Sequence, residues 1–106
     1  MEELFGTKEA AGPHVQMAMV YRQQSRWTAE LKAAQRAIDL HPEYSEGYYE
    51  LACALARPGR TKQALSALSK AVELGLYDSD LIATEPDLRA LSSLPAFKKL
   101  LAEQEK

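Results

Sequence analysis

The feature of this chain that most constrains its fold is an internal repeat with a period of 34 residues. When the sequence is compared with itself at that offset, apolar residues coincide with apolar ones and charged residues with residues of like charge. The coinciding pairs are Met17 with Leu51, Ala18 with Ala52, Tyr21 with Leu55, Arg26 with Arg60, Leu31 with Leu65, Arg36 with Lys70, Ala37 with Ala71, Ile38 with Val72, Asp39 with Glu73 and Leu40 with Leu74. A period of this length is typical of helical solenoids, whose repeats bury their apolar faces against one another. The repeat therefore predicts paired helices.

The first copy carries the local signals of two helices. The segment from Pro13 to Gln24 has no proline or glycine after its first residue. A second apolar stripe follows at helical spacing and consists of Trp27, Leu31, Ala34 and Ile38. The step from His41 to Pro42 predicts the end of this helix, because proline disfavours helical geometry in the residue before it.

The second copy shows the same organisation. Ser45 is a favourable N-cap for a helix that runs to about Ala56. Pro58 and Gly59 predict a turn, and Gly75 favours the end of the helix that follows. Because no strand-like alternation bounded by turns occurs, we predict an all-α fold.

After Tyr77 the period is lost, but helix signals continue. The run Thr84 to Asp87 is a capping-box variant with proline in the first helical turn, where its missing N–H matters least. A last helix is lined by Phe97, Leu100 and Leu101. The end of a solenoid has to be covered, so we predict that residues 79–106 form capping helices.

Composition and motifs exclude several classes of function. A chain of 106 residues is sufficient for one domain, and a net charge of −2 argues against nucleic-acid binding. The single cysteine forms no internal disulfide, and no apolar run is long enough for a membrane span. No secretory signal opens the sequence, so we expect a cytoplasmic location. Phosphate-binding, dinucleotide, HExxH and CxxC motifs are missing, so we expect no enzyme, no cofactor and no bound metal.

At this point the sequence resembles the tetratricopeptide repeat family, whose repeats place small and aromatic residues at fixed positions of two helices. The second copy carries Tyr48, Leu51, Ala52, Leu55, Gly59, Ala64, Leu68 and Ala71 at those positions, and the first carries His14, Met17, Ala18, Tyr21, Trp27, Ala37 and Pro42. The resemblance covers residues 11–78. It implies a right-handed α-solenoid of two helix-turn-helix repeats, at 11–44 and 45–78, after an N-terminal extension at 1–10. The tail looks like a segment that often closes such repeats in bacterial multidomain proteins, which suggests a bacterial origin.

The resemblance also implies a function. In this family the first helices of successive repeats line a concave groove that binds a peptide, so the leading hypothesis is a non-catalytic protein-binding adaptor or scaffold. The predicted groove consists of Val15, Met19, Arg22, Gln23, Glu46, Tyr49, Glu50, Cys53 and Arg57. We expect Tyr49 to point toward the groove and to be its main contact residue, the alternative being an ordinary half-exposed tyrosine, and we expect Cys53 to behave as a small buried hydrophobe.

Two features of the predicted groove depart from the family. The subclass that clamps the C-terminal carboxylate of chaperones uses cationic and amide side chains where this chain has Val15, Met19 and Glu50, so we expect a different partner. An apolar peptide with some basic character fits better. Glu30 occupies the place of a small residue at the closest helix crossing, and we expect either looser packing of the first repeat or a rotation of its second helix that lets this carboxylate reach water.

The alternative hypothesis is self-association. The opening helix is apolar nearly all the way round from His14 to Tyr21, and a helix of this kind needs cover on every side. Its outer face, with Met17 and Val20, would be covered by Leu4 and Phe5 or by a second copy in a homodimer. The chain would then be an oligomerisation module, alone or as the tail of a larger protein.

Overall fold

The structure is a computed structural model and describes residues 8–76 and 79–104. Every regular element within these ranges is a helix, which confirms the all-α prediction. The elements are the 3₁₀ helices η1 (Lys8–Ala10) and η2 (Pro86–Leu91) and the α-helices α2 (Ala11–Gln23), α3 (Trp27–Leu40), α4 (Ser45–Ala56), α5 (Thr61–Glu73), α6 (Ser79–Thr84) and α7 (Pro95–Gln104). None of these described helices has the length and apolar character needed to cross a membrane.

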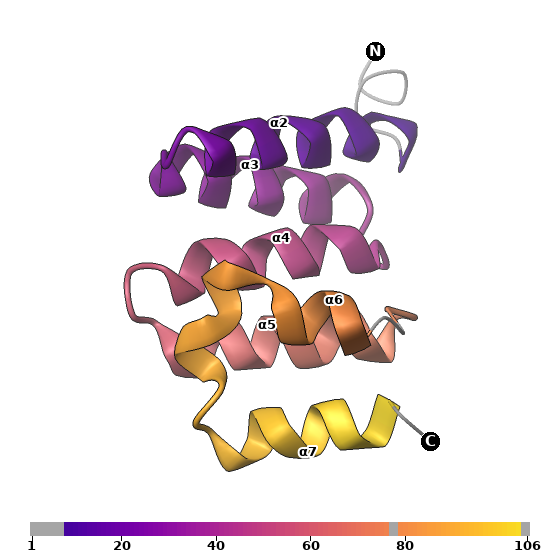
Figure 1. Cartoon of the computed structure of the whole chain (residues 1–106). Helices are drawn as coiled ribbons and strands as arrows, with labels where there is room; N and C mark the ends of the chain where they lie inside the picture. The colour runs from indigo at the N-terminus through magenta and orange to yellow at the C-terminus, as the bar shows by residue number, and fades with distance from the viewer. Residues whose placement is uncertain (1–7, 77–78, 105–106) are drawn as a thin grey trace.

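Helices α2 to α5 lie one on the next in chain order and run in alternating directions (Figure 1). They form two helical hairpins, α2–α3 and α4–α5. The first helices of the hairpins begin at Ala11 and Ser45, and the second helices at Trp27 and Thr61, so both starts lie 34 residues apart. The helices therefore follow the period found in the sequence.

Small residues let the two hairpins approach closely. Helix α3 buries Ala33, Ala34 and Ala37 together with Ile38. Opposite them, a Cβ atom added to Gly47 of α4 would lie 3.2 Å from Ile38 Cγ1, which is tighter than ordinary van der Waals contact. The crossing of α3 and α4 therefore depends on a residue without a side chain.

The turns inside the hairpins require a left-handed backbone. Gly59 has a φ angle of 87°, which glycine adopts without steric cost, and the turn predicted at Pro58 and Gly59 is confirmed. In the first hairpin Ser25 takes the same kind of conformation with a φ angle of 59°. A side chain at this φ is uncommon, so the first turn carries strain that the second avoids.

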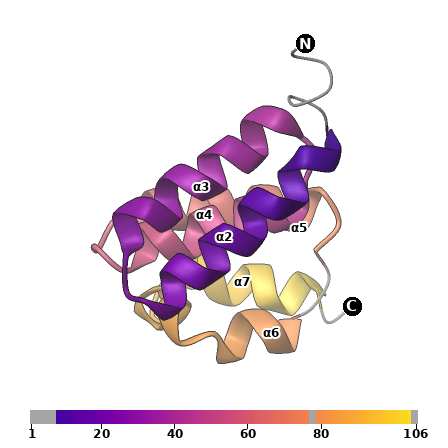
Figure 2. The same ribbon diagram turned by 90° about the horizontal axis from the view of Figure 1, so that it is seen from above.

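After the second hairpin the chain folds back on itself. The returning segment, α6 and η2 at residues 79–91, crosses α4 and α5, and α7 lies along α5 at the end of the stack (Figures 1 and 2). Three of its side chains, Ile82, Leu88 and Leu91, are buried in one core with Leu68 of α5. The tail is thus part of the main core.

A helix cap lies within the predicted run from Thr84 to Asp87, but the cap residue is Glu85, because Thr84 is the last residue of α6. The carboxylate of Glu85 accepts a hydrogen bond of 3.2 Å from the backbone N–H of Asp87, and Pro86 is the first residue of the helix. The predicted cap of α4 was wrong by one residue: Ser45 is already helical, and Tyr44 occupies the cap position without a side-chain hydrogen bond. The covering of α2 by residues 4 and 5, and the repeat boundary at 78, lie outside the described residues.

Candidate functional site

The residues of the predicted groove are largely covered. Tyr49, which we expected to be a contact residue or at least half exposed, has only 6% of its surface accessible, and Glu50 and Cys53 beside it are also buried. The returning segment lies over this side of α4 and supplies the covering groups (Figure 2). Of the remaining groove residues, Gln23 and Glu46 are exposed, and Met19, Arg22 and Arg57 are half-buried.

Val15 does not lie where the groove was predicted. Its side chain is buried in a second, smaller core with Ala11 and Ala37, against which Leu40 and Tyr44 also pack. The residue therefore holds α2 onto the start of the second hairpin, and it offers no surface to a ligand.

Arg22 is the centre of a cluster of ion pairs beneath the returning segment. Its guanidinium lies 3.2 Å from a carboxylate oxygen of Glu85, 3.7 Å from Glu50 and 3.9 Å from Asp87. Opposite charges keep this guanidinium protonated, so its pKa is raised even though burial acts in the other direction. One side chain of α2 thus connects α4 with the start of η2.

Arg57 at the end of α4 forms the second half of the cluster. It lies 3.2 Å from Oε1 of Glu30 and 3.5 Å from Asp87, and it donates a hydrogen bond of 3.4 Å to the carbonyl oxygen of Arg22. The alternative in which Glu30 reaches water was wrong, because the side chain has no accessible surface. The guanidinium of Arg57 pairs with this carboxylate in the place of water.

The cluster holds more negative than positive charge. Glu30, Glu50, Glu85 and Asp87 face only two arginines, and one carboxylate oxygen each of Glu30 and Glu50 has no hydrogen-bond partner among the described residues. The pKa of Glu30 is raised to about 7, mainly by burial and also by the neighbouring charge of Glu50, while Arg57 acts in the opposite direction. The pKa of Glu50 is also raised to about 7, again mainly by burial.

Tyr49 and Cys53 complete the contacts between α4 and the returning segment. The hydroxyl of Tyr49 donates to Oε2 of Glu85 over 3.3 Å, and burial raises the pKa of this phenol. Burial also raises the pKa of the Cys53 thiol, which lies 3.5 Å from a nitrogen of Arg22. A thiol kept protonated in this way is a poor nucleophile.

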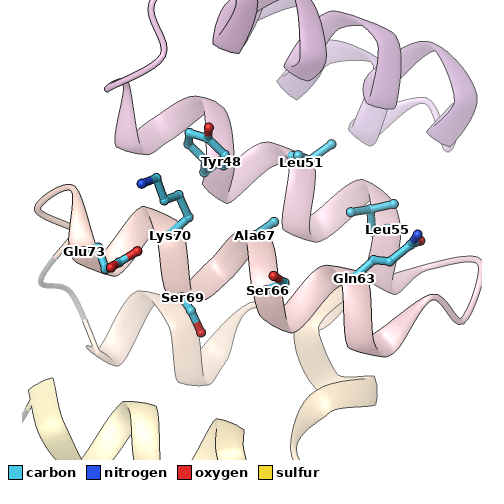
Figure 3. A pocket seen from close by; sticks show the side chains of 9 residues that line it. All are labelled: Tyr48, Leu51, Leu55, Gln63, Ser66, Ala67, Ser69, Lys70 and Glu73. Carbon is cyan, nitrogen blue, oxygen red and sulfur yellow. The ribbon is translucent and has the colours of Figure 1, made fainter.

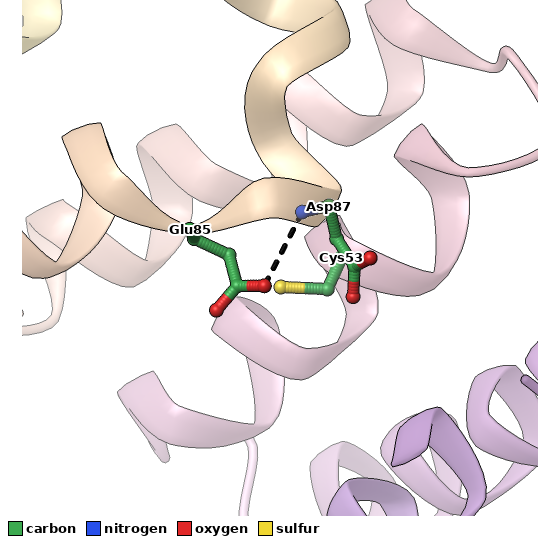
Figure 4. Close-up of side chains that lie close together, drawn as sticks. All are labelled: Cys53, Glu85 and Asp87. Atoms are coloured by element: carbon green, nitrogen blue, oxygen red, sulfur yellow. Dashed lines mark hydrogen bonds between the residues drawn. The ribbon is translucent and has the colours of Figure 1, made fainter. Parts of the chain in front are cut away.

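Cys53, Glu85 and Asp87 bring one sulfur and two carboxylates within 4.8 Å of one another, as Figure 4 shows. This donor set could in principle hold a cation. However, the guanidinium groups of Arg22 and Arg57 already pair with these carboxylates. A metal ion would have to displace them, so the arrangement is better suited to fastening the returning segment.

The opposite side of the stack is open. A furrow runs along α4 between α3 and α5 and consists of two adjoining hollows of about 540 and 390 Å³. Half-buried Tyr48, Leu51 and Leu55 form its floor (Figure 3). Its other lining residues are Leu31, Lys32, Gln35, Arg60, Gln63, Ser66, Ala67, Ser69, Lys70 and Glu73.

The first hairpin carries a smaller version of the same hollow, with a volume of about 370 Å³. Its lining residues lie 34 positions before residues of the furrow, so the two hollows are equivalent by the repeat; they are His14, Met17, Tyr21, Ala29, Lys32, Ala33 and Arg36. Sequence reasoning assigned Tyr48, Leu51 and Leu55 only to packing. Their recurrence at the repeat period was the signal that could have identified a shared surface.

Together, the fold and these surfaces define an all-helical pair of stacked hairpins, closed on one side by its own tail and open on the other. No family model matches the chain, and no curated protein or solved structure shows significant similarity to it. The residues on the closed side and on the open side are therefore the basis for its function.

Proposed function

We propose that this chain is a non-catalytic protein-binding module of the tetratricopeptide repeat type, and that a segment of its partner binds in the furrow. The observation that carries the proposal is the furrow floor, where three half-buried apolar side chains remain open along α4. Apolar surface rimmed by polar groups is characteristic of protein-interaction sites. Tyrosine and leucine on the floor, with Lys32, Arg60 and Lys70 at the rim, offer anchoring contacts and orienting charges.

The predicted groove is the weaker site for this function. A peptide could reach Tyr49 and Cys53 only after the returning segment had left, and that movement breaks the ion pairs of Arg22 and Arg57 with Glu85 and Asp87. It would also expose apolar side chains such as Leu88. The furrow requires no such rearrangement.

Site-specific photo-crosslinking separates these two surfaces. A photoreactive amino acid is placed at Ser66 in the furrow, at Glu46 in the predicted groove, or at Ser93 near the tail, all of which are exposed. The expected result is a partner protein crosslinked in cells from position 66, with little crosslinking from 46 or 93.

A competition experiment tests the same point with folded protein. Added protein with Ser66→Arg, which fills the furrow, should no longer suppress the crosslink, whereas the matched control Ser93→Arg should compete like the parent. Equal crosslinking from all three positions, or full competition by Ser66→Arg, would contradict a furrow site. Crosslinking from Glu46 alone would assign the function to the predicted groove.

A further inference from the structure

No described element packs on the outer face of α2. Met17 and Val20 have 43% and 42% of their surface accessible, and no described helix lies beyond α2 in the stack (Figure 1). Pro13 and Gln16, on the same side of the helix, are also exposed. We call these four residues the end face.

The repeat shows what kind of element fits this face. Two of its equivalents on α4, 34 positions later, are buried: Ala54, which corresponds to Val20, is 1% accessible, and Gly47, which corresponds to Pro13, packs against Ile38 of α3. The equivalent of Met17 is Leu51, which stays half-buried on the furrow floor. The chain therefore contains a template in which a helix packs beside this type of face, and among the described residues the end face lacks that helix.

Charge indicates the chemistry of the missing helix. The α2–α3 hairpin has six charged side chains, of which Arg22 and Glu30 are directed into the ion-pair cluster. The exposed remainder is cationic apart from Asp39, which accepts a hydrogen bond from Gln35; the cations are Arg26, Lys32 and Arg36. None of these cations takes part in an ion pair with another described residue.

We propose that the end face is the docking site of an amphipathic helix from a partner protein, with an apolar face like that of α3 and acidic residues at its edges. Such a helix would lie over Val20 and beside Met17, and its carboxylates would meet the three cations. Lys32 also lies at the rim of the furrow, but the four residues of the end face do not line it, so the proposal does not depend on the function assigned there.

A second copy of this chain fits the end face less well. In a symmetric dimer each end face would meet its own copy, and the cations beside it would oppose one another. A head-to-tail arrangement would bring α7, where Lys98 and Lys99 are exposed, toward the same cations. Both arrangements juxtapose like charges.

Two synthetic peptides test the proposal. Both have the sequence of α3, residues 27–40, with the same apolar face. In the acidic peptide Lys32→Glu and Arg36→Glu make all four charged positions negative, and in the basic peptide Glu30→Lys and Asp39→Lys make them all positive. Binding of the fluorescently labelled peptides to the full chain is followed by anisotropy, and we expect the acidic peptide to bind about tenfold more tightly, because each exposed ion pair contributes modestly.

Variants of the protein show whether the peptide binds at the end face. Val20→Glu should weaken the acidic peptide about tenfold, while Ala102→Glu, the same type of change on exposed α7, should have less than a twofold effect. Lys32→Glu with Arg36→Glu in the protein should reverse the preference toward the basic peptide. Circular dichroism confirms that each variant is folded.

The proposal is overturned by equal affinity for the two peptides, by no measurable binding of either, or by binding that Val20→Glu leaves unchanged. Sedimentation equilibrium tests the alternative that a second copy of the chain occupies the end face. A dimer of the parent chain that Val20→Glu dissociates would assign the end face to a second copy instead.

Discussion

The buried carboxylate of Glu30 leads to an unusual prediction: replacing it with glutamine should stabilise the protein at high pH. The pKa of Glu30 is raised in the folded state from an ordinary value of 4.5 to about 7. Between these two values the folded state binds the proton more tightly than the unfolded state does. The contribution of Glu30 to the free energy of unfolding therefore falls as the pH rises through this window, and it is constant above it.

The size of the effect follows from the shift. One unit of pKa corresponds to about 1.4 kcal/mol, so Glu30 contributes about 2.5 kcal/mol less to stability at about pH 8 than at about pH 5. Glutamine has the shape of the protonated acid and does not titrate. Relative to the parent, Glu30→Gln should gain about 2.5 kcal/mol between these conditions.

Urea unfolding followed by far-UV circular dichroism measures this difference at both pH values. The control is Glu43→Gln, an exposed carboxylate outside the cluster, whose effect should stay within about 0.5 kcal/mol at either pH. The reasoning fails if Glu30→Gln destabilises the protein more at high pH than at low pH. That outcome would mean that the ion pair with Arg57 outweighs the burial of the charge.

Three further predictions concern an ion pair, the packing of the core and the backbone of a turn, and the same unfolding measurement checks them. Arg57→Ala should destabilise the protein by about 3–5 kcal/mol at about pH 8, because it leaves the buried Glu30 charge unpaired, and by less at about pH 5. An equal loss of stability at the two pH values would contradict the role of the unpaired charge. Leu68→Ala removes a fully buried side chain from the core shared with the tail and should lower stability by about 2–5 kcal/mol, and a loss below about 1 kcal/mol would show that the site is not closely packed. Gly59→Ala forces a side chain into left-handed backbone and should destabilise by about 1–2 kcal/mol, whereas Gly12→Ala, in α2 with open space around its Cβ, should stabilise by about 0.5–1 kcal/mol; effects of the same sign would refute the backbone argument.

The sequence was sufficient to predict most of the helices because their signals are local or periodic. The stop at His41 and the turn at Gly59 appear where the residue chemistry indicated, and the helix start predicted between Thr84 and Asp87 appears with Pro86 in its first turn. The repeat period located both hairpins because each helix pair has to present the same apolar stripe to its neighbour.

The closed state of the predicted groove could not be obtained in this way. Arg22 and Arg57 also pair with Glu85 and Asp87, which the tail brings across α4, and a contact between residues so far apart leaves no periodic trace. The same holds for Tyr49, whose hydroxyl donates to the carboxylate of Glu85 in the tail. The sequence was sufficient to assign these side chains to the correct helices, but the groups that surround them come from distant parts of the chain.

Arg22 has a consequence for how the protein folds. In an ordinary solenoid each repeat contacts only its neighbours, so the ends can unravel independently. Here Arg22 contacts Asp87, 65 residues further along the chain, and joins the first hairpin to the tail. During synthesis Arg22 can meet Glu85 and Asp87 only after these residues have left the ribosome, so this connection between the first hairpin and the tail forms late in folding. The molecule should therefore lose its structure as one unit, and not by fraying from either end.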